Sequence, residues 1–189
     1  MSESEYLAQA HLIERQTIEI SPIKTSGLIL DIGGGGEGII GKLNGEQVVA
    51  IDKRQSELEE TENKALKIVM DATDLKFLTE TFTVATAFFT MMYIPNDLKQ
   101  RVFEETYRVL KKGGCFYIWD ANIPEKIDDK KYFVIPLEVI MPEETVETGY
   151  GVHLKKQEMQ SLKQLALGTG FKIIKEETQE HTFYLKFEK

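Results

Sequence analysis

The chain has 189 residues, of which 42% are hydrophobic and 29% are charged. This length and composition indicate one globular domain and exclude collagen, coiled coil and wholesale disorder. The formal net charge of −8 disfavours nucleic acid as a partner, because an acidic surface repels phosphate. With one cysteine, three scattered histidines and no apolar run of membrane-spanning length, we expect a cytoplasmic protein without a disulfide, a metal site or a membrane segment.

The N-terminal segment has the spacing of a helix. Tyr6, Leu7, Ala10 and Ile13 recur at helical intervals within residues 4–16, and the pattern ends before Ser21-Pro22. From residue 28 onwards, short apolar runs alternate with helix-prone segments. The runs predict strands at 28–32, 48–51, 68–70, 82–89 and 115–119. Helices are expected after Gly38, at 56–64 and from Asn96 to the glycines at 113–114.

This alternation predicts an α/β fold with βαβ crossovers, a parallel sheet and helices on both faces. The tail differs, because residues 132–154 have strand character, 154–167 form a helix, and 171–174 and 182–185 are expected to pair as an antiparallel edge hairpin. We therefore expect one domain in four segments. These are a leading helix and linker (1–24), a cofactor-binding core (25–122), a β-rich insert or lid (123–154), and a last helix with the edge hairpin (155–189).

A glycine-rich loop directly follows the first buried strand. Four consecutive glycines, Gly33 to Gly36, are costly in backbone entropy, which indicates a ligand held close to the backbone. Gly33, Gly35 and Gly38 also match the dinucleotide fingerprint G-x-G-x-x-G, so this loop alone leaves NAD, FAD and other adenosyl ligands open. No Gly-Lys-Ser/Thr follows, which excludes a P-loop.

Three carboxylates close the first three strands. Asp31 precedes the glycines, where it would repel a pyrophosphate but suit a ligand with ammonium and sulfonium charges. Asp52 has the position of a ribose-binding acid, and Asp71 that of an acceptor for an adenine amino group. These acids favour an adenosyl cofactor that carries positive charge.

With these motifs, the sequence resembles the class I S-adenosylmethionine-dependent methyltransferases over about residues 25–120. The resemblance implies a Rossmann-like, doubly wound sheet of seven mostly parallel strands with an antiparallel last strand. It implies S-adenosylmethionine as the cofactor, with Asp52 on both ribose hydroxyls, Asp71 and Ala72 at adenine, and Ala87 and Phe88 beside the methionyl part. The full set of cofactor residues that we expect is Asp31, Gly33, Gly34, Gly35, Asp52, Lys53, Asp71, Ala72, Ala87 and Phe88.

The chain departs from the family pattern at three positions. Glu37 stands where the third glycine of acid-x-Gly-x-Gly-x-Gly falls, Thr83 replaces a common aspartate, and Lys112 replaces the proline of the VLKPGG turn. Glu37, Thr83 and the absence of an evident catalytic base leave open a cofactor-binding or partner-binding module of the same fold without transfer activity. An NAD-dependent oxidoreductase is the other alternative, supported by the glycines and Asp52 alone.

The methyl acceptor is expected at the carboxyl ends of the fourth and fifth strands, where open α/β sheets bind ligands. Candidates for contacting it are Tyr93, Asp120, Asn122 and His153. The alternatives are a packing role for Tyr93, a loop-capping role for Asp120 and a solvated position for His153. No catalytic base is evident. We expect a small-molecule acceptor beneath residues 123–154, with the sheet core complete without that insert. A homodimer contact through the insert's edge is the alternative role.

Overall fold

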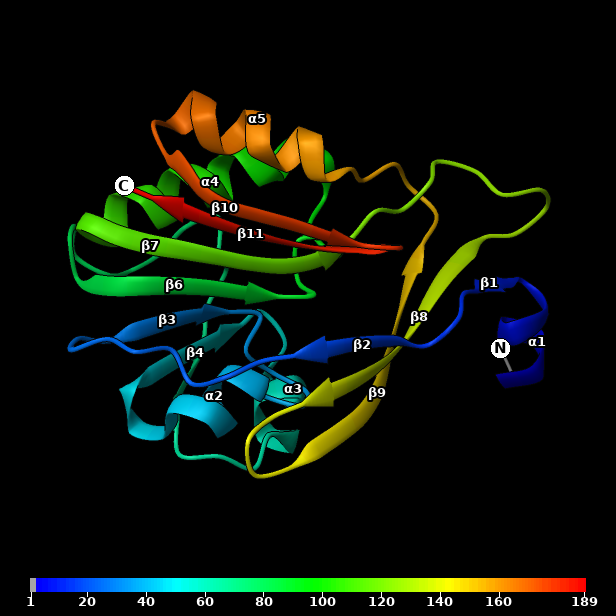
Figure 1. Cartoon of the computed structure of the whole chain (residues 1–189), viewed down its shortest axis with the longest axis horizontal. Helices are drawn as coiled ribbons and strands as arrows, with labels where there is room; N and C mark the ends of the chain where they lie inside the picture. The colour runs from blue at the N-terminus through cyan, green and yellow to red at the C-terminus, as the bar shows by residue number, and fades with distance from the viewer. Residues whose placement is uncertain (1–2) are drawn as a thin grey trace.

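A computed structural model describes residues 3–189, and a seven-stranded sheet forms its centre (Figure 1). The strand order is β10-β11-β7-β6-β3-β4-β5. The five parallel strands are β3 (Ile29–Ile32), β4 (Val48–Asp52), β5 (Leu66–Val69), β6 (Phe82–Phe88) and β7 (Leu110–Ala121). The antiparallel pair β10 (Lys172–Gln179) and β11 (Thr182–Glu188) completes it, with β11 antiparallel to β7. The predicted α/β sheet with an antiparallel last strand is confirmed.

Helices cover both faces of this sheet. On one face lie α4 (Asn96–Val109) and α5 (Met159–Thr169), and on the other lie α2 (Ile39–Asn44) and α3 (Gln55–Glu60), with a short 3-10 turn at Gly45–Gln47 (Figure 1). Val102, Phe103 and Val109 bury one side of α4 against Phe116 and its neighbours in the sheet, as an amphipathic helix requires. Among the helices in residues 3–189, none has the length and apolar character needed to cross a membrane.

The β7 strand begins earlier than predicted. The Lys-Lys-Gly-Gly sequence at 111–114 was expected to end α4, but the helix stops at Val109 and the strand runs from Leu110. A bulge accommodates it, because Phe82 pairs with Leu110 while Val84 pairs with Cys115. Gly113 sits in this bulge with a φ of 72°, a conformation that favours glycine.

A second sheet packs beside the first and contains the predicted insert. Its hairpin is β8 (Tyr132–Ile140) and β9 (Thr145–His153), and the free edge of β8 pairs in parallel with β1 (Ala10–Leu12) and β2 (Gln16–Glu19). The prediction of a leading helix over 4–16 is therefore wrong beyond α1 (Glu3–Ala8). Its apolar spacing is real, but pairing with β8 outweighs the local preference. Ile13 and Ile20, which directly follow the two strands, lie in the same core cluster as β8.

The second sheet is part of the core. Alternate side chains of β8, namely Phe133, Ile135, Leu137 and Val139, are at most 1% exposed and join the cluster around Ile29 and Ile40. The expectation that the sheet core is complete without residues 123–154 is wrong for this reason. The insert therefore covers one face of the main sheet and supplies part of the hydrophobic core on that face.

Candidate functional site

A pocket of about 640 Å³ opens at the carboxyl ends of β3, β4, β5 and β6. The glycine loop forms one wall, the segment from Phe88 to Pro95 forms another, and β9 contributes Gly149, Tyr150 and Gly151. All but one of the predicted cofactor residues line it, namely Asp31, Gly33, Gly34, Gly35, Asp52, Lys53, Asp71, Ala72 and Phe88. Ala87 is fully buried within β6 and does not line the pocket.

Asp31 is a buried carboxyl group at the floor of this pocket. Only 2% of the residue is exposed, and its Oδ1 accepts a hydrogen bond of 2.8 Å from the Thr86 hydroxyl on the neighbouring strand. Burial raises the pKa of Asp31 from 3.8 to about 7, and the nearby Asp52 charge adds to the rise while Thr86 opposes it. A cationic ligand group would stabilise the charged form of this poorly solvated carboxyl group.

Asp52 and Asp71 lie farther along the same wall. Asp52 ends β4 and accepts a hydrogen bond of 2.8 Å from the Arg54 backbone N–H, which fixes the direction of its side chain. Asp71 accepts bonds from the backbone and hydroxyl of Thr73, and its other oxygen lies 3.2 Å from Lys53 Nζ. These hydrogen bonds, followed by the Lys53 charge, lower the pKa of Asp71. Both acids therefore present fixed oxygen atoms to the pocket.

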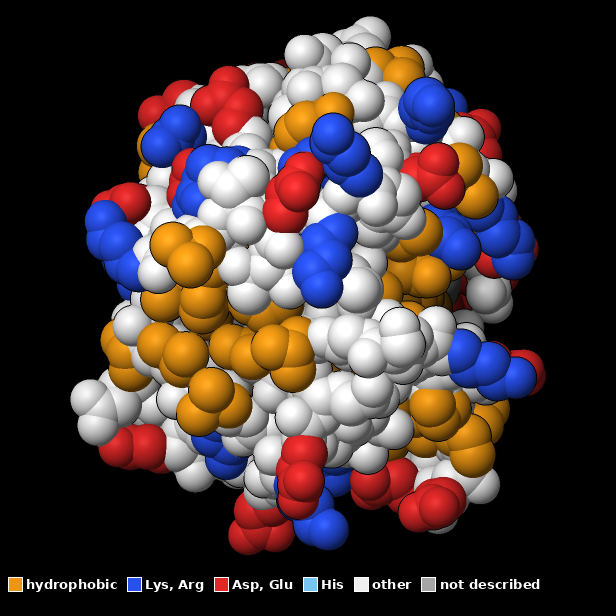
Figure 2. All heavy atoms as spheres, turned by 90° about the vertical axis from the view of Figure 1, so that its left-hand side faces the viewer, with side chains coloured by type: hydrophobic (Ala, Val, Ile, Leu, Met, Phe, Trp, Pro, Cys, Tyr) orange, Lys and Arg blue, Asp and Glu red, His pale blue; other side chains and the backbone are white. Residues whose placement is uncertain are grey.

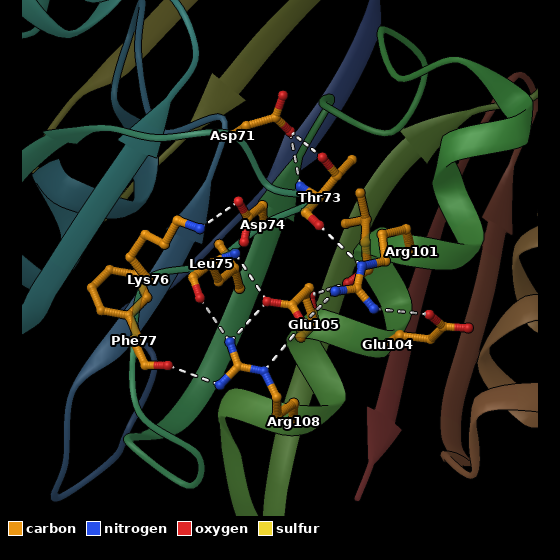
Figure 3. A network of polar contacts seen from close by, with 12 residues as sticks. Asp71, Thr73, Asp74, Leu75, Lys76, Phe77, Arg101, Glu104, Glu105 and Arg108 are labelled. Atoms are coloured by element: carbon orange, nitrogen blue, oxygen red, sulfur yellow. Dashed lines mark hydrogen bonds and ion pairs between the residues drawn. The ribbon is translucent and has the colours of Figure 1, made fainter.

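A polar network ties the loop after β5 to α4 (Figure 3). Glu105, which is buried, accepts a hydrogen bond of 2.9 Å from the Leu75 backbone N–H and pairs with Arg108 at 2.8 Å. Arg108 in turn donates to the carbonyls of Leu75 and Phe77 at 2.7 and 2.8 Å, and Arg101 donates to that of Thr73. The pairing with Arg108 lowers the pKa of Glu105. This network holds the segment that carries Asp71.

The glycine loop is packed tightly against protein atoms. A Cβ at Gly33, Gly34 or Gly35 would come closer than 3.0 Å to Thr90, Asp31 or Glu57 respectively. Packing within the chain therefore accounts for these three glycines, and a ligand is not needed to explain them. The N–H groups of Gly33 and Gly34 donate to the Ile51 carbonyl, and that of Gly36 donates to Glu57. Because these N–H groups already have acceptors, the loop has fewer free hydrogen-bond donors for a pyrophosphate than a phosphate-binding loop has.

Glu37 joins the glycine loop to the second sheet, a link that the sequence alone did not reveal. One carboxylate oxygen accepts a hydrogen bond from the Thr148 hydroxyl, and the other accepts one of 3.0 Å from Tyr150 Oη. The Tyr150 ring stacks on Phe89, with ring centroids 5.4 Å apart. The replacement of the third motif glycine by glutamate was the available signal, but its partners lie more than 100 residues away.

The structure brings one of the four acceptor candidates into the pocket. Tyr93 lines it and is 44% exposed. Asn122 instead accepts a hydrogen bond from the Met159 backbone N–H at the start of α5. His153 lies on the exposed face of β9 against Tyr132. Neither Asn122 nor His153 is in the pocket wall, and Asp120 is buried behind it.

Asp120 supports the pocket from behind. Its carboxylate accepts hydrogen bonds from the backbone N–H of Met92 at 3.2 Å and from the Gln157 side chain at 2.7 Å. Gln157 also accepts a bond of 2.5 Å from the buried Lys99. Burial raises the pKa of Asp120 to about 6 and lowers that of Lys99 to about 8. The network fixes the segment that presents Tyr93.

A larger groove of about 890 Å³ lies elsewhere, between residues 17–24 and the face of β7, β10 and β11. Its floor consists of the stacked rings of Tyr117 and Trp119 and the tilted ring of Tyr184 beside them. It lacks the strand-end carboxylates, so we place the candidate site in the smaller pocket. Within residues 3–189, no group of three or more His, Cys, Asp or Glu side chains is arranged to hold a metal ion.

Comparisons with known proteins agree with this geometry. Residues 30–118 match a sequence family described as a methyltransferase domain. No curated protein sequence matches the chain. A protein of Pyrococcus horikoshii OT3 has a similar structure, with a TM-score of 0.66, 20% identity, and coverage of 87% of this chain and 82% of that one.

Two further solved structures have the same fold. One is a SAM-dependent methyltransferase of Methanosarcina mazei, with a TM-score of 0.61, 19% identity, and coverage of 88% of this chain and 94% of that one. The other is an S-adenosylmethionine-dependent methyltransferase of Clostridium acetobutylicum, with a TM-score of 0.61, 14% identity, and coverage of 87% and 84%.

Proposed function

We propose that the protein transfers the methyl group of S-adenosylmethionine to a small molecule enclosed beneath β9, because residues 30–118 match a methyltransferase domain. The observation that carries this proposal is the pocket itself. Three strand-end carboxylates, Asp31, Asp52 and Asp71, line it together with Tyr93 and β9. A volume of about 640 Å³ lies within the range of small-molecule and cofactor sites, roughly 300–1,000 Å³.

The residues present fit this cofactor. The buried Asp31 carboxyl group has one oxygen engaged by Thr86, and its charge is stabilised best by a cation such as the cofactor's ammonium group. Asp52, held by the Arg54 N–H, would bind the ribose hydroxyls, and Asp71 with Ala72 would contact adenine. The glycine loop, whose engaged N–H groups offer little to a pyrophosphate, supports this ligand over NAD.

S-adenosylmethionine supplies an activated methyl group on a positively charged sulfur. The protein's part is to hold the acceptor in line with that group and to exclude water, which is where much of the catalysis of a displacement originates. Tyr93, supported through Asp120, and Tyr150, supported through Glu37, face the space left for the acceptor. Phe88 and Phe89 supply apolar wall on the same side.

A small acceptor agrees with the surface of the protein. The net charge of −8 opposes binding along a phosphate backbone. On the end of the molecule away from the pocket, Lys and Arg side chains are interspersed with Asp and Glu (Figure 2). A cytoplasmic location accords with the single cysteine. A homodimer through the exposed edge of β9 stays a proposal that sedimentation would test.

Calorimetry with S-adenosylmethionine, S-adenosylhomocysteine and NAD, each titrated into the full chain, tests the proposal. We expect both sulfur compounds to bind at one site and NAD to give no heat of binding. Binding of NAD alone would favour the oxidoreductase alternative. Binding of both sulfur compounds without methyl transfer to any of a wide set of small molecules would favour the non-catalytic module.

A further inference from the structure

Glu37 and Tyr150 form a pair that the methyltransferase motifs do not account for. Glu37 stands in the glycine loop, and Tyr150 stands on β9, 113 residues later. Both residues line the pocket. Their hydrogen bond of 3.0 Å runs from the Tyr150 hydroxyl to the Glu37 carboxylate, so the hydroxyl proton is already engaged. With its proton engaged, the Tyr150 oxygen can only accept a hydrogen bond from a ligand.

Two features hold Tyr150 in this orientation. Its ring stacks on Phe89, with an angle of 18° between the ring planes. Phe89 adopts a φ of 49°, a left-handed conformation that is unfavourable for a bulky side chain. Such backbone strain persists where the surroundings enforce it, and it is frequent at functional sites. Here it places the Phe89 ring beneath Tyr150 at the end of β6, beside the predicted methionyl site at Phe88.

Thr148 fixes the other side of Glu37. Its hydroxyl donates to the second carboxylate oxygen, so each oxygen of Glu37 receives one hydroxyl donor from β9. The carboxylate is thereby held in one orientation. A fixed negative charge behind an oxygen that only accepts hydrogen bonds favours a ligand that donates them and carries positive charge.

The charges around the pocket point the same way. Its lining contains six carboxylates, which are Asp31, Glu37, Asp52, Glu57, Glu60 and Asp71, against two basic residues. Both basic residues are already paired, Lys53 with Asp71 at 3.2 Å and Arg54 with Glu57 at 3.0 Å. An anionic acceptor would find no unpaired cation among the lining residues, whereas a cationic group would be attracted.

We propose that the methyl acceptor is an amine, that its N–H is received by Tyr150 Oη, and that Glu37 is the positioning residue for this contact. The inference rests on the proposed methyltransferase function and adds the class of acceptor. Tyr150 would touch the substrate, while Glu37 acts through Tyr150.

The transfer step balances without another reactant. An amine that binds as its ammonium first loses a proton to water. The lone pair of the neutral nitrogen then forms a bond to the methyl carbon, and the bond from that carbon to sulfur breaks. Its electron pair stays on sulfur, which becomes the neutral thioether of S-adenosylhomocysteine. The nitrogen gains the positive charge and later releases a proton to water. Glu37 stabilises this developing charge through the Tyr150 hydroxyl dipole.

A binding experiment on the full chain loaded with S-adenosylhomocysteine tests the inference. The probes are two matched series, benzylamine with benzyl alcohol and benzoate, and butylamine with butanol and butyrate. We expect an amine of at least one series to bind about tenfold more tightly than the alcohol or the carboxylate of the same skeleton. Equal affinities, a preference for the alcohol or the carboxylate, or no amine binding at millimolar concentration would each overturn the inference.

Variants separate a contact from a general loosening of the pocket. Tyr150→Phe should lower amine affinity about tenfold while leaving carboxylate affinity unchanged, so that the amine selectivity is lost. Glu37→Gln retains an oxygen for Tyr150 but removes the charge, and it should lose part of the selectivity. Thr148→Val frees one Glu37 oxygen and should also lose part of the selectivity, because the carboxylate is then no longer held from both sides. Equal weakening of all probes by Tyr150→Phe would indicate a merely structural role and overturn the proposal.

The matched control is Tyr107→Phe, which removes the same atom on the opposite face of the sheet, where the ring packs on Phe171. It should leave every affinity unchanged. Failure of the unaltered chain to bind S-adenosylhomocysteine would overturn the proposed function, and this inference with it. Binding of S-adenosylhomocysteine without amine selectivity would overturn the inference alone.

Discussion

At the scale of single residues, the burial of Asp31 gives the cofactor site a dependence on pH. The fold raises the pKa of this carboxyl group from 3.8 to about 7, so it is largely protonated below that pH. If the cofactor's ammonium group requires the charged form, S-adenosylmethionine affinity should fall as the pH decreases from about 8 to about 6, by up to tenfold per pH unit below the pKa. Calorimetry across this range measures it.

Asp31→Asn is the variant that isolates this effect. Because the folded chain binds the proton more tightly than the unfolded chain, ionisation of Asp31 destabilises the fold progressively as the pH rises from 3.8 to about 7. Asparagine removes that cost while still accepting a bond from Thr86. At about pH 8 the apoprotein should therefore melt no lower than the wild type, while its cofactor affinity is weaker and independent of pH. A lower melting temperature would contradict the account.

Asp52→Ala tests the ribose contact. Hydrogen bonds from hydroxyls to a carboxylate are worth roughly 1.5–3 kcal/mol each, so affinity for S-adenosylmethionine should fall at least tenfold in a folded protein. The half-buried side chain accepts one bond from Arg54 N–H, so little stability is lost. Retained affinity, with an unchanged circular dichroism spectrum, would place the ribose elsewhere.

At the scale of elements, the network between α4 and the loop after β5 is expected to support both folding and the site. Glu105→Gln leaves Arg108 without its charged partner, and we expect a loss of about 2 kcal/mol in the free energy of unfolding. Urea denaturation would measure this. Arg101→Gln, at a residue whose side chain is 54% exposed, is the control and should lose under about 1 kcal/mol.

The buried position of the second sheet leads to a prediction about removal of the insert. Replacing residues 125–150 by a short Gly/Ser loop removes Phe133, Ile135, Leu137 and Val139, each at most 1% exposed. Burying one such side chain is worth roughly 1.5–3 kcal/mol, so losing four should exceed the stability of a typical domain or leave it marginal. We expect a loss of cooperative unfolding. A folded variant that binds cofactor would show that the insert is a dispensable cover.

The sequence was sufficient for the elements whose partners are near in the chain. The βαβ units from 28 to 120, the glycine loop and the acids at 31, 52 and 71 follow from runs and spacings within a few tens of residues. What it could not predict depends on distant pairing. The β1 strand was taken for helix and β2 was not predicted, because β8, the partner of both, begins at Tyr132. In the sequence, Glu37 is only a departure from the glycine motif; its hydrogen-bond partners on β9, Thr148 and Tyr150, are evident only in the structure.

At the scale of the whole molecule, ligand binding should register in thermal stability. A ligand that binds only the folded state at about 100 times its dissociation constant adds roughly 2.7 kcal/mol. S-adenosylmethionine should therefore raise the melting temperature by several degrees, about 2–4 °C per kcal/mol for a chain of this size. NAD should leave it unchanged. A rise with NAD alone would contradict the assignment of the pocket.

The parallel pairing of the first strands with β8 has a consequence for how the chain becomes folded. Gln16 pairs with Leu137, so more than a hundred residues must be synthesised before β2 finds its neighbour. Contacts between such distant segments are slow to form, because loop closure must precede the stabilisation they bring. On the ribosome, Ile13, Ile18 and Ile20 would lack their neighbours from β8 until residues 132–140 emerge. The N-terminal strands β1 and β2, which are synthesised first, would therefore be among the last elements to fold.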